Sequence, residues 1–181
     1  GCYFDNFWYD GSVVRFNRNR VNDNAAVGGC GGCRFDDIEH AEVDVIGNQF
    51  NRNTAGGDYG GLFFDGVRLG AVVRVWDNQI IGNRAGLTET VRVGDRVAPA
   101  PARILGGDYG GLYLEAIGSG GEVDVRRNRV LSNTAYLTGT TGGDYAGMNA
   151  YLGEAGLLTM VDNTIAGNEA QGSLGGFYAE L

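Results

Sequence analysis

The chain has 181 residues, 33 of them glycine and only 2 proline, with a formal net charge of −8 and a pI near 4.5. This acidic balance argues against a nucleic acid or an anionic membrane surface as the partner. No apolar run approaches the roughly 18–20 residues that span a bilayer, so membrane insertion is not expected.

One motif recurs along the chain. It consists of an alternating apolar pair, two asparagines with an apolar residue between them, and an alanine. The five copies contain, in chain order, Val14, Phe16, Asn19, Val21, Asn24 and Ala26; Val43, Val45, Asn48, Phe50, Asn53 and Ala55; Val73, Val75, Asn78, Ile80, Asn83 and Ala85; Val123, Val125, Asn128, Val130, Asn133 and Ala135; and Leu158, Met160, Asn163, Ile165, Asn168 and Ala170.

Self-similarity at a period of about 30 residues, with short strands and Gly/Asn turns, is typical of a β-solenoid. One such repeat buries its apolar face only by stacking on its neighbours. We therefore predict an all-β fold in which residues 1–181 form a single-domain right-handed parallel β-helix of about five to six rungs. The rungs are expected to start near residues 12, 42, 71, 122 and 157.

The first repeats carry all three cysteines of the chain. Cys2 and Cys33 fall at equivalent inward positions, and their expected spacing suits a disulfide, which would fit an extracellular compartment. Cys30 and Cys33 also form a Cys-x-x-Cys pair, which raises zinc or redox chemistry. Only His40 lies nearby as a further zinc ligand, and no helix N-terminus supports a thiolate. A buried structural role, bonded or free, is favoured.

Aligned repeats predict columns of equivalent residues, about 4.8 Å apart. One outward column alternates in charge and contains Arg15, Asp44, Arg74, Asp124 and Thr159. Opposite charges on adjacent rungs favour the register, although each exposed pair contributes at most about 1 kcal/mol. Two further columns consist of the motif's asparagines. We interpret these as corner residues, because asparagine tolerates left-handed backbone geometry and its amide can bond to the copies above and below.

Three Gly-Gly-Asp-Tyr segments follow the alanines and form another predicted column. They bring together Asp58, Asp108 and Asp144, with Tyr59, Tyr109 and Tyr145 beside them. Stacked carboxylates and turn carbonyls are the ligands that calcium prefers, so these aspartates are candidate calcium ligands. The alternative, which we favour, is that they bond to turn N–H groups as ordinary Asx turns.

Two insertions leave the repeat at the same corner, at residues 86–105 and 136–141. The longer one contains a Gly-Asp turn between short apolar stretches and reads as a small hairpin. Loops on a rigid scaffold often carry function, so these insertions predict a contact surface for a partner protein or a glycan. Its candidate residues are Arg92, Arg96, Arg103, Tyr109 and Tyr136. The alternative is a tolerated surface insertion.

The repeat resembles the paired FxxN and GGA[ILV] repeats of polymorphic outer-membrane-protein (autotransporter) passengers, within the right-handed parallel β-helix class. FxxN is literal at Phe50–Asn53 and varied in the other copies, whereas GGA[ILV] is replaced by segments such as Gly-Gly-Leu-Phe at residues 60–63. The resemblance covers nearly the whole chain. It implies a secreted or surface-exposed protein that is often adhesive.

The sequence as a whole therefore predicts a non-catalytic structural or adhesive solenoid at the cell surface or secreted. The chain starts and ends at one phase of the repeat, which suits either a segment of a longer passenger or a filament subunit that stacks end to end. The alternative is a carbohydrate-binding or carbohydrate-active, pectin lyase-like β-helix. Scattered carboxylates, a single histidine and no recognisable nucleophile or phosphate motif disfavour an enzyme.

Overall fold

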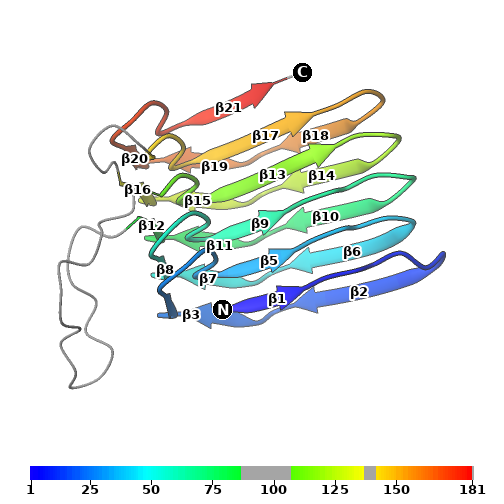
Figure 1. The fold of residues 1–181 in the computed structure, drawn as a ribbon, viewed down its shortest axis with the longest axis horizontal. Helices are drawn as coiled ribbons and strands as arrows, with labels where there is room; N and C mark the ends of the chain where they lie inside the picture. Colours follow the sequence, from blue (N-terminus) through cyan, green and yellow to red (C-terminus); the bar gives the residue numbers. More distant parts are fainter. Residues whose placement is uncertain (87–106, 137–141, 181) are drawn as a thin grey trace.

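The computed structural model describes residues 1–86, 107–136 and 142–180. It shows a parallel β-solenoid of about five turns (Figure 1) in which every turn contributes one strand to each of four sheets. The described residues contain no helix. The predicted fold class is confirmed. Apart from Gly86 and Tyr136, the two predicted insertions lie outside the described residues.

The four sheets are named here sheets 1 to 4 in the order in which the chain visits them. Sheet 1 contains β1 (Cys2–Phe4), β5 (Cys33–Phe35), β9 (Leu62–Phe64), β13 (Leu112–Ile117), β17 (Met148–Leu152) and β21 (Phe177–Glu180). Sheet 2 contains β2 (Ser12–Asn17), β6 (Ala41–Ile46), β10 (Val72–Trp76), β14 (Glu122–Arg126) and β18 (Leu157–Val161). Sheet 3 contains β3 (Arg20–Asn22), β7 (Gln49–Asn51), β11 (Gln79–Ile81), β15 (Arg129–Leu131) and β19 (Thr164–Ala166). Sheet 4 contains β4 (Ala25–Ala26), β8 (Thr54–Ala55), β12 (Arg84–Ala85), β16 (Thr134–Ala135) and β20 (Glu169–Ala170).

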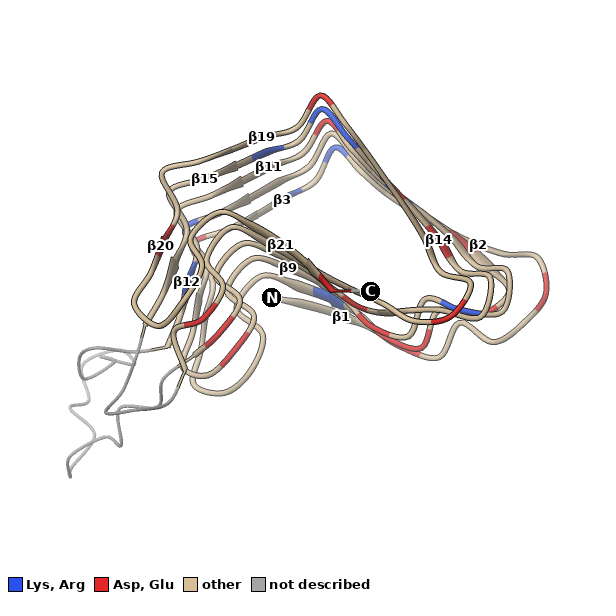
Figure 2. Ribbon diagram, turned by 90° about the horizontal axis from the view of Figure 1, so that it is seen from above, with Lys and Arg blue, Asp and Glu red and all other residues tan. Residues whose placement is uncertain are grey.

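Strands of successive turns pair in parallel and in the register that the repeat alignment predicts. In sheet 2, Val73 of β10 lies opposite Val43 of β6 on one side and Val123 of β14 on the other. Seen from above in Figure 2, the chain runs anticlockwise from β1 to β4 while it rises toward β21, so the solenoid is right-handed.

The core is a column of apolar side chains inside the solenoid. Phe35 is fully buried and stacks on Phe4 and Phe64 of the adjacent rungs, with ring centroids 4.8 and 5.1 Å apart. Full burial of such a side chain stabilises the fold by about 1.5–3 kcal/mol. The equivalent apolar residues of the end rungs, such as Val14 and Leu158, are only partly buried because they have a stacking neighbour on one side.

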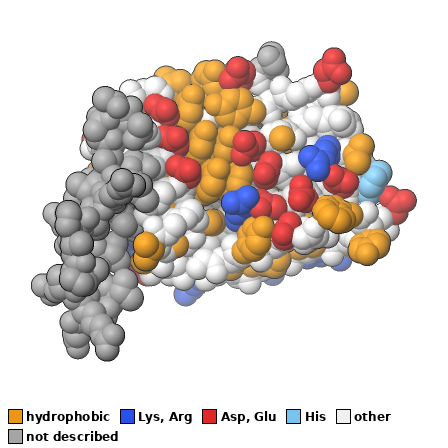
Figure 3. All heavy atoms as spheres, in the orientation of Figure 1, with side chains coloured by type: hydrophobic (Ala, Val, Ile, Leu, Met, Phe, Trp, Pro, Cys, Tyr) orange, Lys and Arg blue, Asp and Glu red, His pale blue; other side chains and the backbone are white. Residues whose placement is uncertain are grey.

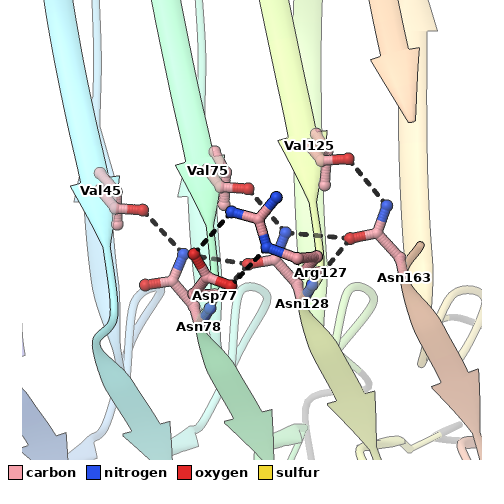
Figure 4. A network of polar contacts seen from close by, with 8 residues as sticks. All are labelled: Val45, Val75, Asp77, Asn78, Val125, Arg127, Asn128 and Asn163. Atoms are coloured by element: carbon pink, nitrogen blue, oxygen red, sulfur yellow. Dashed lines mark hydrogen bonds and ion pairs between the residues drawn. The ribbon is translucent and has the colours of Figure 1, made fainter. Parts of the chain in front are cut away.

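Asparagine side chains form two hydrogen-bonded ladders inside the solenoid, and Figure 4 shows part of one of them. The Nδ2 of Asn78 donates to the backbone oxygen of Val45 at 2.7 Å and to Oδ1 of Asn128 at 3.0 Å. Its Oδ1 accepts from the backbone N–H and from Nδ2 of Asn48, at 2.8 and 3.0 Å. An amide offers two donors and two lone pairs, so the buried side chain of Asn78 makes every bond it can make.

The predicted left-handed geometry of these asparagines is wrong. The left-handed residue is the one that precedes each asparagine, such as Arg18 with φ 58°, Asp77 with φ 57° and Asp23 with φ 59°. This preceding residue turns the corner with its own side chain outside, and the turn aims the next side chain inward. The amide of the asparagine is thereby placed in the core, where adjacent rungs satisfy it.

The outward charge column is present in register, but it does not pair throughout. Asp44 forms ion pairs with Arg74 at 3.0 Å and with Arg15 at 3.8 Å. Asp124, in contrast, pairs with Arg126 of its own strand at 2.6 Å. The alternation predicts Arg74 of the adjacent rung as the partner of Asp124. Arg126, two residues along the same strand, pairs with Asp124 instead.

Replacement of Asn78 by alanine is expected to lower the free energy of unfolding by about 3 kcal/mol or more. The change leaves the buried Val45 oxygen and the Asn48 N–H groups without partners, at about 1–3 kcal/mol for each unsatisfied group. Urea unfolding followed by circular dichroism measures the loss. Asn19→Ala is the matched control in a partly exposed end rung, where the side chain donates one bond, to Asn48. Equal losses for the two variants would contradict the role given to the ladder.

Candidate functional site

The outer face of sheet 1 differs from the other outer faces in carrying aromatic and acidic side chains side by side. After each Gly-Gly pair the strand alternates, so that Leu62 and Phe64 point inward while Phe63 and Asp65 point outward. The first outward column contains Tyr3, Arg34, Phe63, Tyr113, Asn149 and Tyr178. The second contains Asp5, Asp36, Asp65, Glu115, Tyr151 and Glu180.

Tyrosines from the turn before sheet 1 cover the first of these columns. Tyr59 stacks on Phe63 with ring centroids 4.0 Å apart and an interplanar angle of 3°. Tyr109 stacks on Tyr113 at 3.7 Å and 4°. Phe63 and Tyr113 consequently retain only 1% and 3% exposure, whereas Tyr59 and Tyr109 remain partly exposed.

The backbone of the turn explains this placement. Tyr59 and Tyr109 adopt left-handed conformations, with φ 57° and 42°, which are uncommon outside glycine. The same segments contain glycines at which a Cβ would collide with the next rung. At Gly61, for example, it would meet the backbone oxygen of Gly111. Close packing of the rungs therefore requires glycine beside the tyrosines.

We call Tyr59, Tyr109 and Tyr145 the tyrosine platform. Neighbouring rings have centroids 5.5 Å apart and interplanar angles of 10° and 9°, so they form a continuous offset stack across three rungs. Figure 3 looks onto this face, where a band of hydrophobic side chains runs between acidic side chains on both sides.

Carboxylates line one edge of the platform. Asp36 is buried and accepts both of its short bonds, at 2.7 and 2.6 Å, from Nε of Arg34. The Arg34 guanidinium also lies 5.0 Å from the ring centroid of Phe63. Asp65 and Glu115, on the next two rungs, form no ion pair with any arginine of the described residues.

Burial is the main cause that raises the pKa of both unpaired carboxyl groups above their usual range. For Asp65 the charge of Asp36 adds to the effect. For Glu115 the pKa is raised further by Asp65 and is partly lowered by a hydrogen bond with Tyr113. Burial likewise raises the pKa of Tyr59 to about 12, so the platform is uncharged at neutral pH.

A hollow of about 490 Å³ opens beside the platform, lined by Tyr109, Tyr113, Glu115, Ala116, Tyr151, Leu152 and Gly153. A difference in length between two rungs creates it. Ala116, with φ 52°, is an extra left-handed residue between Leu114 and Ile117, and β17 has no counterpart to it because Leu152 pairs directly with Ile117. The shorter fifth rung leaves the side of Glu115 and Tyr113 uncovered.

The aspartates predicted as calcium ligands bond to backbone N–H groups of the next rung. Asp58 accepts from the N–H of Asp108 at 3.0 Å, and Asp108 accepts from the N–H of Asp144 at 3.1 Å. They therefore connect one rung to the next, and these bonds are not the local Asx turns that the sequence favoured. Among the described residues no group of three or more His, Cys, Asp or Glu side chains is arranged to hold a metal ion. Calcium binding remains a prediction.

The predicted Cys2–Cys33 disulfide is absent, because all three cysteines are free. Cys2 and Cys33 are register partners in β1 and β5, as the alignment indicates. Parallel strands hold equivalent Cβ atoms about as far apart as the Cα atoms, near 4.8 Å, which exceeds the Cβ spacing of about 3.8 Å in a disulfide. Burial raises the pKa of Cys30 to about 11 and raises that of Cys33 still further, so neither thiol is activated. His40, the other candidate zinc ligand, contacts Asp10 at 3.4 Å.

The predicted partner-binding residues divide into two groups. Arg92, Arg96 and Arg103 lie outside the described residues. Tyr109 belongs to the platform, whereas Tyr136 follows β16 and donates its backbone N–H to the oxygen of Ala85. Sequence reasoning missed Phe63, Tyr113, Asp65 and Glu115. The strict alternation after each Gly-Gly pair is the signal that would have placed them on the outer face.

Comparisons of the chain with known protein families, with curated proteins and with solved structures find no match. The resemblance to autotransporter passenger repeats therefore stays an interpretation of the motif. Within the described ranges no helix is long and apolar enough to cross a membrane.

Replacement of Glu115 by glutamine is expected to raise the melting temperature at neutral pH. Because its pKa is raised in the fold, ionisation of Glu115 disfavours the folded state once the pH exceeds the unfolded value of about 4.3. The stabilisation should disappear below about pH 4, where the carboxyl group is protonated in both states. Thermal melts between acid and neutral pH measure it. Glu122→Gln, an exposed residue of β14, is the matched control and should change little. A destabilised Glu115→Gln at pH 7 would contradict this account.

Proposed function

We propose that this chain is a non-catalytic structural and adhesive β-solenoid, secreted or displayed at a cell surface. The observation that carries the proposal is the outer face of sheet 1. There the same aromatic and acidic columns repeat on successive rungs around Tyr59 and Tyr109. Repeated contact sites on a rigid support give multivalent attachment, in which modest individual contacts add up.

The asparagine ladders support the mechanical half of the proposal. Each internal asparagine ties its rung to the rungs on both sides, as Asn128 does through Asn78 and Asn163. A solenoid held in this way transmits load along its axis and keeps the spacing of the outer columns constant. Placement outside the cell is part of the proposal, and it rests on the resemblance of the repeat to those of autotransporter passengers.

The proposal includes further rungs stacked on the end rungs, supplied either by more of a longer chain or by a second copy. At the end that carries β21, the inward side chain of Phe177 is 44% exposed, and the inward Leu158, Met160 and Ile165 are only partly buried. The strands of that rung also present unpaired edges, which accept further strands readily.

Negative-stain electron microscopy of the purified chain, with and without calcium, tests the filament form of the proposal. Stacking of copies predicts rods of constant width. Ile165→Lys places a charge on the inward side of the end rung and should abolish them, whereas Leu157→Lys, on the outward side of the same rung, should not. Dispersed particles of the unmodified chain would contradict the filament form. The other form of the proposal, a segment of a longer solenoid, would then be the one that stands.

A carbohydrate-active enzyme is the second candidate, and one observation favours it. Asp65 and Glu115 lie on adjacent rungs, Glu115 lines the hollow, and both carboxyl groups have a raised pKa, as the acid of a glycosidase does. Release of reducing ends or unsaturated products from polysaccharides, lost in Glu115→Gln, would establish this function in place of the proposed one.

A further inference from the structure

We propose that the outer face of sheet 1 binds an extended amino-sugar chain. The chain lies along the solenoid axis on the tyrosine platform, with its ammonium groups beside Asp65 and Glu115. The inference rests on the proposed adhesive function and deepens it by naming the class of ligand.

The platform supplies the faces of nearly parallel aromatic rings in a repeating, overlapping arrangement. Tyr59 and Tyr109 turn one face toward Phe63 and Tyr113, with ring centroids 4.0 and 3.7 Å apart, and are partly exposed to solvent. Because the inner ring fixes the outer one, the surface is ordered before a ligand arrives, which lowers the entropy cost of binding. The apolar C–H face of a pyranose ring packs on such rings, and the 5.5 Å between neighbouring tyrosine ring centroids accommodates about one sugar residue of an extended chain per tyrosine.

The carboxylates supply the charge selection. Arg34 is already bonded to Asp36, so Asp65 and Glu115 face the platform without an ion-pair partner among the described residues. Half-buried carboxylates of like charge on adjacent rungs destabilise one another, and a cation held between them removes that cost. A cationic ligand is therefore complementary to this face, and an anionic sugar polymer is repelled by it.

A buried amide lies next to Tyr113 in the outward column. Asn149 occupies the place above Tyr113 in the outward column and is 1% exposed, yet neither its Oδ1 nor its Nδ2 has a partner among the described residues. Buried amides are almost always bonded, so an unpartnered one requires an explanation. Tyr151, whose ring lies edge-on to Tyr113 at 5.9 Å, lines the hollow on this side. Asn149 is not among the residues that line the hollow, so the side-chain contacts offered to a ligand there come from Tyr113, Glu115 and Tyr151.

The tyrosine platform and the two carboxylates together distinguish amino sugars from simpler ligands. A lysine-rich peptide or a polyamine would pair with Asp65 and Glu115 but leave the platform uncovered. A neutral glycan would cover Tyr59 and Tyr109 but leave both carboxylates unpaired. An amino-sugar chain meets both requirements with one repeating unit.

Isothermal titration calorimetry of the full chain tests the inference with three probes. These are a glucosamine oligomer of about six β-linked rings, its fully N-acetylated counterpart, and an oligolysine of equal charge. The glucosamine oligomer should bind about tenfold more tightly than either of the others, which corresponds to about 1.4 kcal/mol. Equal binding of oligolysine would overturn the role of the platform, and equal binding of the acetylated oligomer would overturn the role of the charges.

Two substitutions with matched controls locate the site. Tyr59→Ala and Glu115→Gln should each weaken binding of the glucosamine oligomer about tenfold. Tyr9→Ala, at an exposed tyrosine away from the platform, and Glu122→Gln, on sheet 2, should leave it unchanged. Because Glu115→Gln is expected to raise the melting temperature at neutral pH, a thermal melt of the variant separates a loss of affinity from misfolding.

Absence of binding by all three probes would overturn this inference and would leave the adhesive function to a different ligand. Catalytic cleavage of a polysaccharide by the chain would instead overturn the proposed non-catalytic function. The failures of the two proposals are therefore distinguishable in the same set of assays.

Discussion

The side-chain amide of asparagine, bonded in the core to the rungs above and below, is the interaction on which the rest of this structure depends. A four-sided solenoid must turn sharp corners, and each corner leaves backbone N–H and carbonyl groups that no sheet satisfies. Asn78 bonds to one backbone oxygen, one backbone N–H and two neighbouring amides. The ladders therefore close the corners and set the vertical register at the same time.

Fixed register converts a repeated sequence into a repeated surface. Because the rungs stack without offset, each Gly-Gly-Asp-Tyr turn places a tyrosine over the outward residue of its own strand and beside the tyrosine of the next rung. A small difference in length between two rungs then changes the shape of this surface. The single residue by which the fifth rung is shorter, opposite Ala116, opens the hollow next to Glu115.

Much of the fold could be predicted from the sequence, because spacing alone aligns Val43, Val73 and Val123. Local stereochemistry could not be predicted in the same way. The residue that adopts the left-handed conformation is the one before each asparagine, and Cys2 and Cys33 are free although they are register partners. The platform depends on left-handed tyrosines such as Tyr59, which no residue preference indicates. The sequence therefore predicted the tyrosine column of the candidate site but not the outward residues beneath and beside it.

Amide hydrogen exchange measured by NMR tests the central role of the ladders most directly. The backbone N–H groups of Asn48, Asn78 and Asn128 donate to side-chain oxygens of the next rung, not to a backbone carbonyl. Ladders that hold the rungs together predict that these corner amides exchange only through global unfolding, as slowly as the amides of β10. Exchange as fast as that of exposed turn amides would show that the corners open locally and would contradict the account.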